Sequence, residues 1–453
     1  MSGRTSAKPI SRLPLAVLCS LSDGHMLLPY LLFSGLAIKQ PGNADFFVPI
    51  VIAYTVQRAC LMALRGFGEI TNPYRILRGG LFVAFAGALL LLFSPLLMPL
   101  QSVGALLIGA GLSCFGAMFR PMFDLLAARD PACRKSSMPG MLLYTLLSVA
   151  IVALTESVSM AIQAVFFVYL LCALIILCRF DQNGLFENRP AFDTAKRKPV
   201  FFLFGGLYLM CLLVLRQYKQ SGVSVLFWLA PLALFITFLL EAFRDRAKYE
   251  VFVFRTYWAG AVKCFLLLFN LLYHSSVGNT TMVLFTNIAV VLGGFIPALL
   301  AKPLKKLFRE GTLYNSCMML ASALCFLLIV PSNILNFLTI LLCEGLAGIV
   351  SSDNTAAYMK DERHVPLERP LIRERINTAG GVVSQVVLLC VVYLLGEFAA
   401  HRDLMLVNAS AVPDASVAPA LRAACLICTG LLLLTAVLIV CTQKRREQRT
   451  ADK

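Results

Sequence analysis

Charged residues are scarce in this chain. Asp, Glu, Lys and Arg make up 14% of its 453 residues, against about a quarter of an ordinary soluble domain. Hydrophobic residues make up 59%, and they fall in blocks of about 16–25 residues, the length that an α-helix needs to cross a hydrocarbon core of about 30 Å. Low charge and this block length exclude a soluble globular domain and predict an all-α polytopic membrane protein.

Histidine is scarce as well, with four residues and none at H-x-x-H or H-E-x-x-H spacing, so the usual zinc motifs are excluded. The chain also lacks a G-x-x-x-x-G-K-[ST] loop, which argues against direct use of ATP. Its 15 cysteines are scattered through the apolar blocks, which is typical of small buried side chains. We expect no enzyme, no metal site and no cofactor.

We count fourteen predicted spans, of which the last ends shortly before the basic carboxyl tail. Their approximate edges are 13–36, 46–64, 76–98, 102–125, 138–156, 159–178, 200–216, 222–243, 251–273, 280–301, 314–332, 335–352, 376–398 and 418–441.

The net charge of +16 is distributed over loops instead of one soluble face, which argues against nucleic-acid binding. Most of the 40 Lys and Arg fall in every second loop when the amino terminus is placed in the cytoplasm, as the positive-inside rule requires. We therefore expect a multi-pass protein of the cell membrane with both termini cytoplasmic. We expect the chain to lie in the lipid bilayer as a monomer.

The second half of the chain repeats the first weakly. The stretch "GLSCFGAMFRPMFDLLAARD" from Gly111 aligns with "GLAGIVSSDNTAAYMKDER" from Gly345, so spans one to six correspond to spans nine to fourteen. Because six is even, the two six-helix repeats are parallel, with two inserted helices between them. The expected organisation is an N-terminal bundle at 1–178, a linker and inserted helices at 179–250, and a C-terminal bundle with a basic tail at 251–453.

The stretch "LLIGAGLSCFGAMFRPMFDLLAARDPACRKSSMPGM", residues 106–141, resembles the Gly-rich fourth span, basic turn and fifth-span start of the major facilitator superfamily. With fourteen spans, the architecture is similar to that of its drug and proton antiporters. The family's Gly-Asp-Arg-Gly loop between spans two and three is replaced here by "LRGFGEITNPYRILRGG", residues 64–80. The resemblance implies two bundles that expose a central cavity alternately to each side.

Three polar residues interrupt the first two spans. Asp23 lies about ten residues into the first span, close to the midplane, where a carboxylate is expensive and typically functional. The alternative is that Asp23 caps a helix break at Gly24. His25 is a second candidate for substrate or proton binding, or a hydrogen-bond partner for a neighbouring helix. Arg58 in the second span is a candidate partner for an anionic substrate or for Asp23.

Two further candidates lie in the second half. Lys263, near the middle of span nine, would pair with Asp23 because their spans are repeat mates, or it would extend its charge to one interface. Glu344, near the middle of span twelve, is a candidate proton site, and its alternative is a structural hydrogen bond.

Near the cytoplasmic end of span four, Arg120 and Asp124 are spaced to face the same side of a helix. We interpret them as a gate or structural pair in preference to a substrate site. The loop "KDERHVPLERPLIRER", residues 360–375, has alternating charge and is interpreted as a solvated helix on the membrane surface.

The most consistent function is a secondary transporter that moves a small amphipathic or charged organic molecule, coupled to protons, by alternating access. The rival hypothesis is a membrane sensor or scaffold that keeps the bundle without transport. The sequence names neither the substrate nor the direction of movement.

Overall fold

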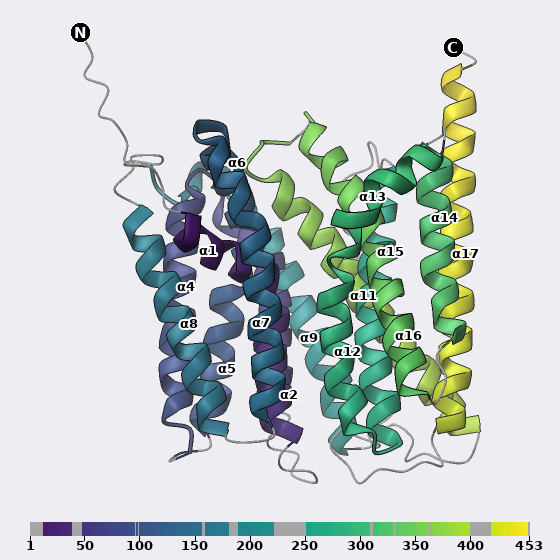
Figure 1. Cartoon of the computed structure of the whole chain (residues 1–453), viewed down its shortest axis with the longest axis horizontal. Helices are drawn as coiled ribbons and strands as arrows, with labels where there is room; N and C mark the ends of the chain where they lie inside the picture. The colour runs from purple at the N-terminus through teal and green to yellow at the C-terminus, as the bar shows by residue number, and fades with distance from the viewer. Residues whose placement is uncertain are drawn as a thin grey trace. The chain divides into compact units, whose positions relative to one another are not determined.

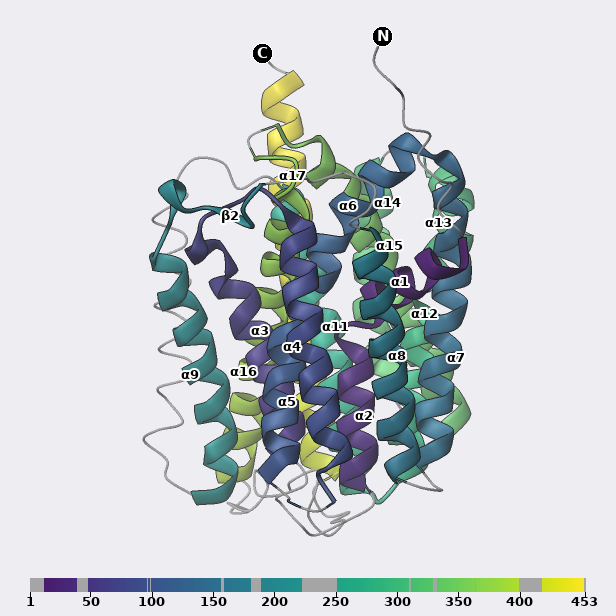
Figure 2. The ribbon, with the colours of Figure 1, turned by 90° about the vertical axis from the view of Figure 1, so that its left-hand side faces the viewer.

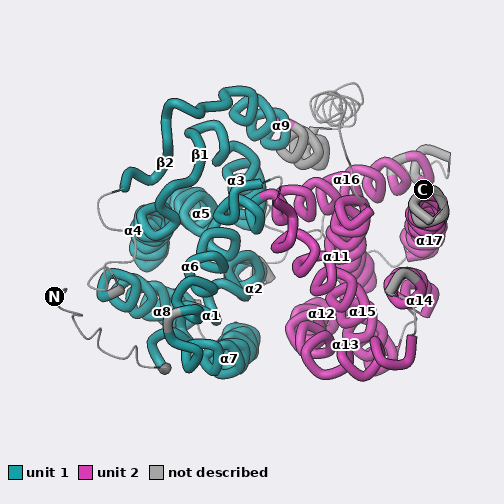
Figure 3. Tube along the Cα trace, turned by 90° about the horizontal axis from the view of Figure 1, so that it is seen from above, with its two compact units in different colours: residues 1–40, 45–209, 364–371 teal, residues 41–44, 210–363, 372–453 magenta. Residues whose placement is uncertain are grey.

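A computed structural model describes residues 12–38, 48–95, 97, 99–155, 159–180, 189–221, 251–308, 311–328, 332–362, 364–398 and 418–451. The chain is an all-α polytopic membrane protein (Figure 1). The described part contains one two-stranded sheet, β1 with β2. It divides into two compact units, coloured separately in Figure 3. Unit 1 comprises residues 1–40, 45–209 and 364–371, and unit 2 comprises 41–44, 210–363 and 372–453.

Unit 1 is built from the first group of helices and the small sheet. Its elements are α1 (Arg12–Gly24), α2 (Leu27–Ile38), α3 (Val48–Ala63), the 3-10 turn η2 (Leu64–Phe67), β1 (Glu69–Ile70), α4 (Pro73–Leu92), α5 (Pro99–Leu112), α6 (Phe115–Arg129), η3 (Pro131–Ser136), α7 (Ser137–Thr155), α8 (Ser159–Phe180), β2 (Phe192–Asp193), η5 (Thr194–Lys196) and the first half of α9 (Val200–Ser221).

Unit 2 contains the later helices, which pack around a core that includes Trp258, Phe265 and Phe269. After the second half of α9, its elements are α11 (Val251–Ser276), α12 (Thr280–Gly293), α13 (Ile296–Leu307), α14 (Gly311–Leu324), η6 (Cys325–Leu328), α15 (Asn333–Lys360), α16 (Arg369–Phe398) and α17 (Ala418–Ala451).

Nine described helices, some joined across short breaks, are long and apolar enough to cross a membrane. Two bent pairs and two shorter apolar helices accompany them. Each predicted span except 222–243 has a helix or helix pair at its position, and 222–243 lies outside the described residues. The two bent pairs are α1 with α2, at 70°, and α12 with α13, at 49°. Predicted spans one and ten are therefore broken helices.

Hydrogen bonds within unit 1 join span ends that the charge pattern places on the same side. The Tyr74 hydroxyl at the start of α4 donates to the Leu177 carbonyl at the end of α8, at 3.1 Å. At the other ends of these helices, Gln163 donates to the Ser94 hydroxyl at 3.3 Å. The helix α4 packs against both α5 and α8, and all three are labelled in Figure 2.

In unit 2, the contacts between helix ends also agree with the sides that the charge pattern predicts. Asn279 and Asn333, which precede α12 and start α15, are joined at 2.7 Å. Lys305 of α13 pairs with Asp353 of α15 at 3.0 Å, at the opposite end of α15. These contacts are consistent with helices that run alternately up and down within each unit.

The two units repeat one another in the order of their helix contacts. In unit 1, α3 and α4 pack on α5, and α8 packs on α4 and α1. In unit 2, the corresponding helices α12 and α14 pack on α15, and α17 packs on α14 and α11. The same neighbours therefore recur at matching places in the chain, and the six-helix repeat stays a prediction.

Candidate functional site

The charged pair in unit 2 joins two helices that pack against each other, α11 and α15. The Lys263 ammonium donates to Glu344 Oε1. The Glu344 side chain is 7% exposed and that of Lys263 is 31% exposed, so both charges lie largely inside the protein. Each lowers the cost of burying the other, because an unpaired charge within a membrane span is expensive.

The break between α12 and α13 lies directly against Glu344. A Cβ on Gly293, the last residue of α12, would lie 2.9 Å from Glu344 Cβ and 2.8 Å from the Leu341 carbonyl oxygen. Farther along α15, Gly345 contacts Ile296 and Gly348 contacts Pro297. Ile296 and Pro297 lie in the first turn of α13. Small residues let the helices approach closely, so the sequence places a carboxylate where a broken helix meets a glycine face.

Neighbours on both sides hold the pair in position. The Ser322 hydroxyl on α14 donates to the Cys343 carbonyl beside Glu344, at 3.0 Å. Next to Lys263, the Cys264 sulfur accepts from Gln385 Nε2 of α16 at 3.0 Å. The helices that carry the pair are therefore each bonded to a further helix, which fixes the position of the carboxylate and the ammonium.

The pairing differs from the hypothesis that Lys263 meets Asp23. Within unit 2, Lys263 already has a carboxylate partner, so a counter-charge from Asp23 is not required. The alternative, that Lys263 extends its charge toward one interface, stays open, since its side chain is 31% exposed while its ammonium donates to Glu344. The two strongest intramembrane candidates of the second half are thus one site.

In unit 1, three charged candidates lie on two helices that pack together, α1 and α6. Arg120 Nε lies 3.7 Å from Asp124 Oδ2 on α6, and both side chains are about half exposed. Asp23 lies at the end of α1, one residue before its last residue, Gly24. The Arg120–Asp124 contact agrees with the predicted structural pair.

His25 lies in the bend between α1 and α2, and Arg58 lies in α3. The buried His25 ring has Nδ1 2.8 Å from the Ser22 carbonyl oxygen, and since a carbonyl only accepts, Nδ1 carries the hydrogen. Gln57 of α3 donates to the His25 carbonyl at 2.8 Å. The Arg58 guanidinium lies 5.0 Å from the centre of the Tyr54 ring. The Gln57–His25 hydrogen bond joins α3 to the bend, whereas the Arg58–Tyr54 contact lies within α3.

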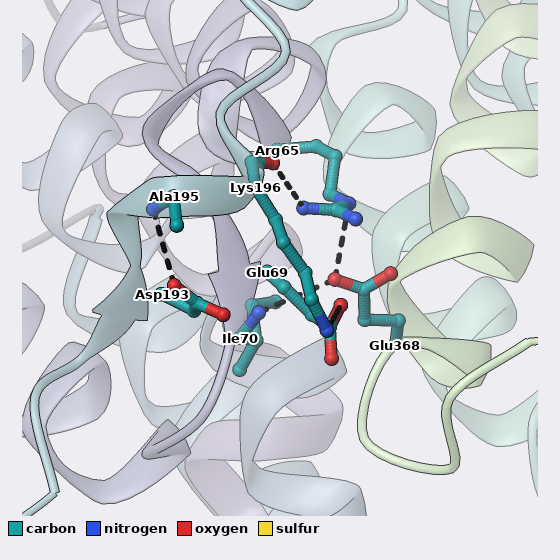
Figure 4. A network of polar contacts seen from close by, with 7 residues as sticks. All are labelled: Arg65, Glu69, Ile70, Asp193, Ala195, Lys196 and Glu368. Atoms are coloured by element: carbon teal, nitrogen blue, oxygen red, sulfur yellow. Dashed lines mark hydrogen bonds and ion pairs between the residues drawn. The ribbon is translucent and has the colours of Figure 1, made fainter.

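A polar network at one end of unit 1 was not predicted (Figure 4). Arg65 of η2 lies 3.0 Å from Glu368 Oε1, and the Ile70 amide of β1 donates to the same oxygen at 3.2 Å. The exposed fractions of Arg65 and Glu368 are 11% and 8%. The predicted surface helix at 360–375 is therefore wrong in part, because Glu368 is buried in a turn and α16 begins at Arg369.

The same network joins the loop between α3 and α4 to the segment after α8. Residues Glu69 and Asp193 are partners in the β1–β2 sheet, and Lys196 pairs with Glu69 at 2.8 Å. Gly68 has φ 139°, and a Cβ there would lie 2.3 Å from the Asp193 carbonyl oxygen, so this crossing needs glycine. None of these residues is a charge inside a predicted span, so the sequence did not identify them as candidates. The one available signal was the stretch 64–80, which differs from the corresponding loop of the resembled family.

Among the residues that the structure describes, no three His, Cys, Asp or Glu side chains lie together as metal ligands would.

Comparison with protein-family models finds no match, and no curated protein matches the sequence. Solved structures with a similar fold include transporters. An auto-inhibited POT family peptide transporter is 13% identical, with TM-score 0.59 over 96% of each chain. The nucleoside transporter NupG is 12% identical, with TM-score 0.52 over 95% of this chain and 99% of that one. A POT family peptide transporter in complex with sulfate is 11% identical, with TM-score 0.60 over 95% and 94%. The chain thus has the fold of such transporters.

Proposed function

We propose that this chain is a secondary transporter that moves a small amphipathic or charged organic molecule by alternating access, with proton uptake at Glu344. The buried Lys263–Glu344 pair beside the helix break carries the proposal. The fold, shared with peptide and nucleoside transporters along most of the chain, supports the same function.

The pair offers a direct way to couple a proton to a change of state. When Glu344 binds a proton, its attraction to the Lys263 ammonium is lost, and the charge in the site rises by one. If one conformation stabilises the ion pair and another stabilises the neutral acid, protonation favours the second. The proton thereby shifts the balance between the two conformations. A cationic substrate would compete with the proton for the carboxylate, as in an antiporter, and an anionic one would be drawn to the freed ammonium.

The test is flux into liposomes that contain the purified chain, driven by a pH gradient across a panel of peptides, nucleosides and organic cations. Peptides and nucleosides are included because a peptide transporter and a nucleoside transporter have a similar fold. We expect Glu344→Gln to abolish gradient-driven flux while exchange of substrate persists, since the amide resembles the protonated acid. Asp353→Asn is the matched control, because it removes a carboxylate from the same helix at its end.

Full gradient-driven transport by both Glu344→Gln and Asp23→Asn would eliminate carboxylate coupling at these residues. Absence of any flux across the panel, with a correctly folded protein, would favour the sensor or scaffold instead.

We further propose a cell-membrane location with both termini cytoplasmic, from the loop charges, and membership of the fourteen-span antiporter branch of the superfamily. A monomer remains our expectation, although one structure of similar fold, with TM-score 0.55, is described as tetrameric. The mass of the particle in lipid nanodiscs would decide the oligomeric state.

A further inference from the structure

A cavity of about 630 Å³ lies in unit 2 where α11 turns into α12 and faces the start of α17. It is separate from the Lys263–Glu344 pair. His274 follows Lys263 by eleven residues on α11, which is about 16 Å of helix. The lining residues are Tyr273, His274, Val277, Asn279, Ala418, Pro419, Arg422, Ala423 and Leu426.

The turn that forms one wall of the cavity has a defined geometry. Gly278 has φ 70°, a left-handed conformation that glycine adopts without strain. The Asn279 amide donates to the His274 carbonyl at 2.8 Å, and the Asn279 side chain accepts from the Met282 amide at 3.1 Å as the cap of α12. The wall is therefore built by the backbone and does not depend on a ligand.

Arg422 brings a positive charge to this cavity from α17. Its Nε and Nη2 donate to the Tyr273 hydroxyl at 3.0 and 2.6 Å, and the guanidinium lies 5.5 Å from the centre of the Tyr273 ring. No carboxylate in the described part of the chain pairs with Arg422. The tyrosine positions the guanidinium, and among the described residues no group neutralises its charge.

His274 is the second polar group. Its side chain is 1% exposed, yet neither ring nitrogen has a hydrogen-bond partner among the described residues. A buried polar group without a partner costs stability, and such groups in native proteins are rare. A neutral imidazole carries one N–H donor, which an acceptor in the cavity would satisfy.

We propose that this cavity binds an oxyanion carried on a small apolar group, with a carboxylate as its chemical type. The Arg422 guanidinium would supply the charge and the His274 ring a hydrogen bond, while Val277, Pro419 and Leu426 would contact the apolar group. Arginine is suited to this role because its fork of donors matches the two oxygens of a carboxylate. The site goes beyond the proposed function, since it involves neither residue of the coupling pair.

The experiment is calorimetric titration of the full chain in nanodiscs of phosphatidylcholine, with benzoate as the probe and benzamide as its uncharged analogue. We expect benzoate to bind at least tenfold more tightly than benzamide. Arg422→Gln and His274→Phe should each weaken benzoate binding at least fivefold. Arg445→Gln, which removes the same charge from an exposed position on α17, should leave it unchanged.

Ala423→Phe keeps both polar groups and fills the cavity, so it should abolish binding even where Arg422→Gln fails to fold. A parallel arm uses discs that contain phosphatidylglycerol, an anionic lipid. If this lipid displaces benzoate from the unmutated chain, the oxyanion comes from a head group, and if it does not, from a free solute. Equal affinity for benzoate and benzamide, or benzoate binding that neither Arg422→Gln nor Ala423→Phe weakens, would overturn the site.

Discussion

Removing both members of the Lys263–Glu344 pair should destabilise the protein by less than the sum of the two single removals. Glu344→Gln leaves an ammonium without its partner, and Lys263→Met leaves a carboxylate that is 7% exposed. Breaking a buried ion pair costs about 3–5 kcal/mol. Because the Lys263 side chain is 31% exposed, water offsets part of the loss, and we expect about 3 kcal/mol for each single change.

The double variant Lys263→Met with Glu344→Gln leaves no stranded charge. It should therefore cost less than the sum of the single changes by about 2–3 kcal/mol, which is the range expected for residues in direct contact. The measurement is equilibrium unfolding in mixed micelles, repeated for the four members of the cycle.

A matched cycle on Lys305 and Asp353 provides the control. This pair also joins α15 to a neighbouring helix, but its side chains are 57% and 28% exposed, so its coupling should be below about 1 kcal/mol. Additive effects at Lys263 and Glu344, or equal coupling in the two cycles, would refute the argument that burial makes the first pair strong.

Gly260→Ala should destabilise unit 2 by about 1–3 kcal/mol, because its Cβ would lie 1.9 Å from a backbone carbonyl of α16, whereas Gly430→Ala, with nothing within 4 Å, should be neutral or stabilising. Arg65→Gln should cost about 2–3 kcal/mol by stranding a buried carboxylate. The hydrogen bond that Lys196 donates to Glu69 raises the pKa of Lys196, so this pair's contribution should stay constant at neutral pH and be lost only above the ordinary lysine range. Val277→Cys should react with an impermeant maleimide from outside, and Lys196→Cys only after permeabilisation.

One result would contradict each of these four predictions. Equal Tm values for the two glycine variants would mean that α11 and α16 separate at little cost. Unchanged unfolding of Arg65→Gln would show that the amide of Ile70 alone suffices for Glu368. A fall in stability between neutral pH and the lysine range would show that another group titrates. Labelling of Val277→Cys and Lys196→Cys from the same side would overturn the fourteen-span topology.

The membrane spans were predictable because each depends on about 20 neighbouring residues. Helix length and low charge within a block suffice to identify a span, and the described helices occur where the sequence places them. The break at Gly24 was an open alternative in the sequence, since Gly-containing spans bend. The break of span ten at Gly293 was not predicted, because glycines also serve close packing in straight membrane helices.

The partner of Lys263 was not predictable in the same way. Lys263 and Glu344 are 81 residues apart, and their meeting depends on α15 packing against α11. The repeat suggested a partner on the equivalent first span, since repeat mates lie on related sides of an axis. The structure shows that a partner within the same unit is available, because both α12 and α11 pack on α15.

Glu368 shows why a charged loop is the hardest part to interpret from sequence. Alternating charges over 360–375 indicate a solvated helix, and that holds wherever no other segment covers the loop. Here the Arg65 guanidinium and the Ile70 amide both reach Glu368, and the sheet beside them is possible only because Gly68 lets the strands approach. The burial of this carboxylate therefore depends on a glycine about 300 residues away in the chain, and a substitution at Gly68 should release Glu368 without touching it.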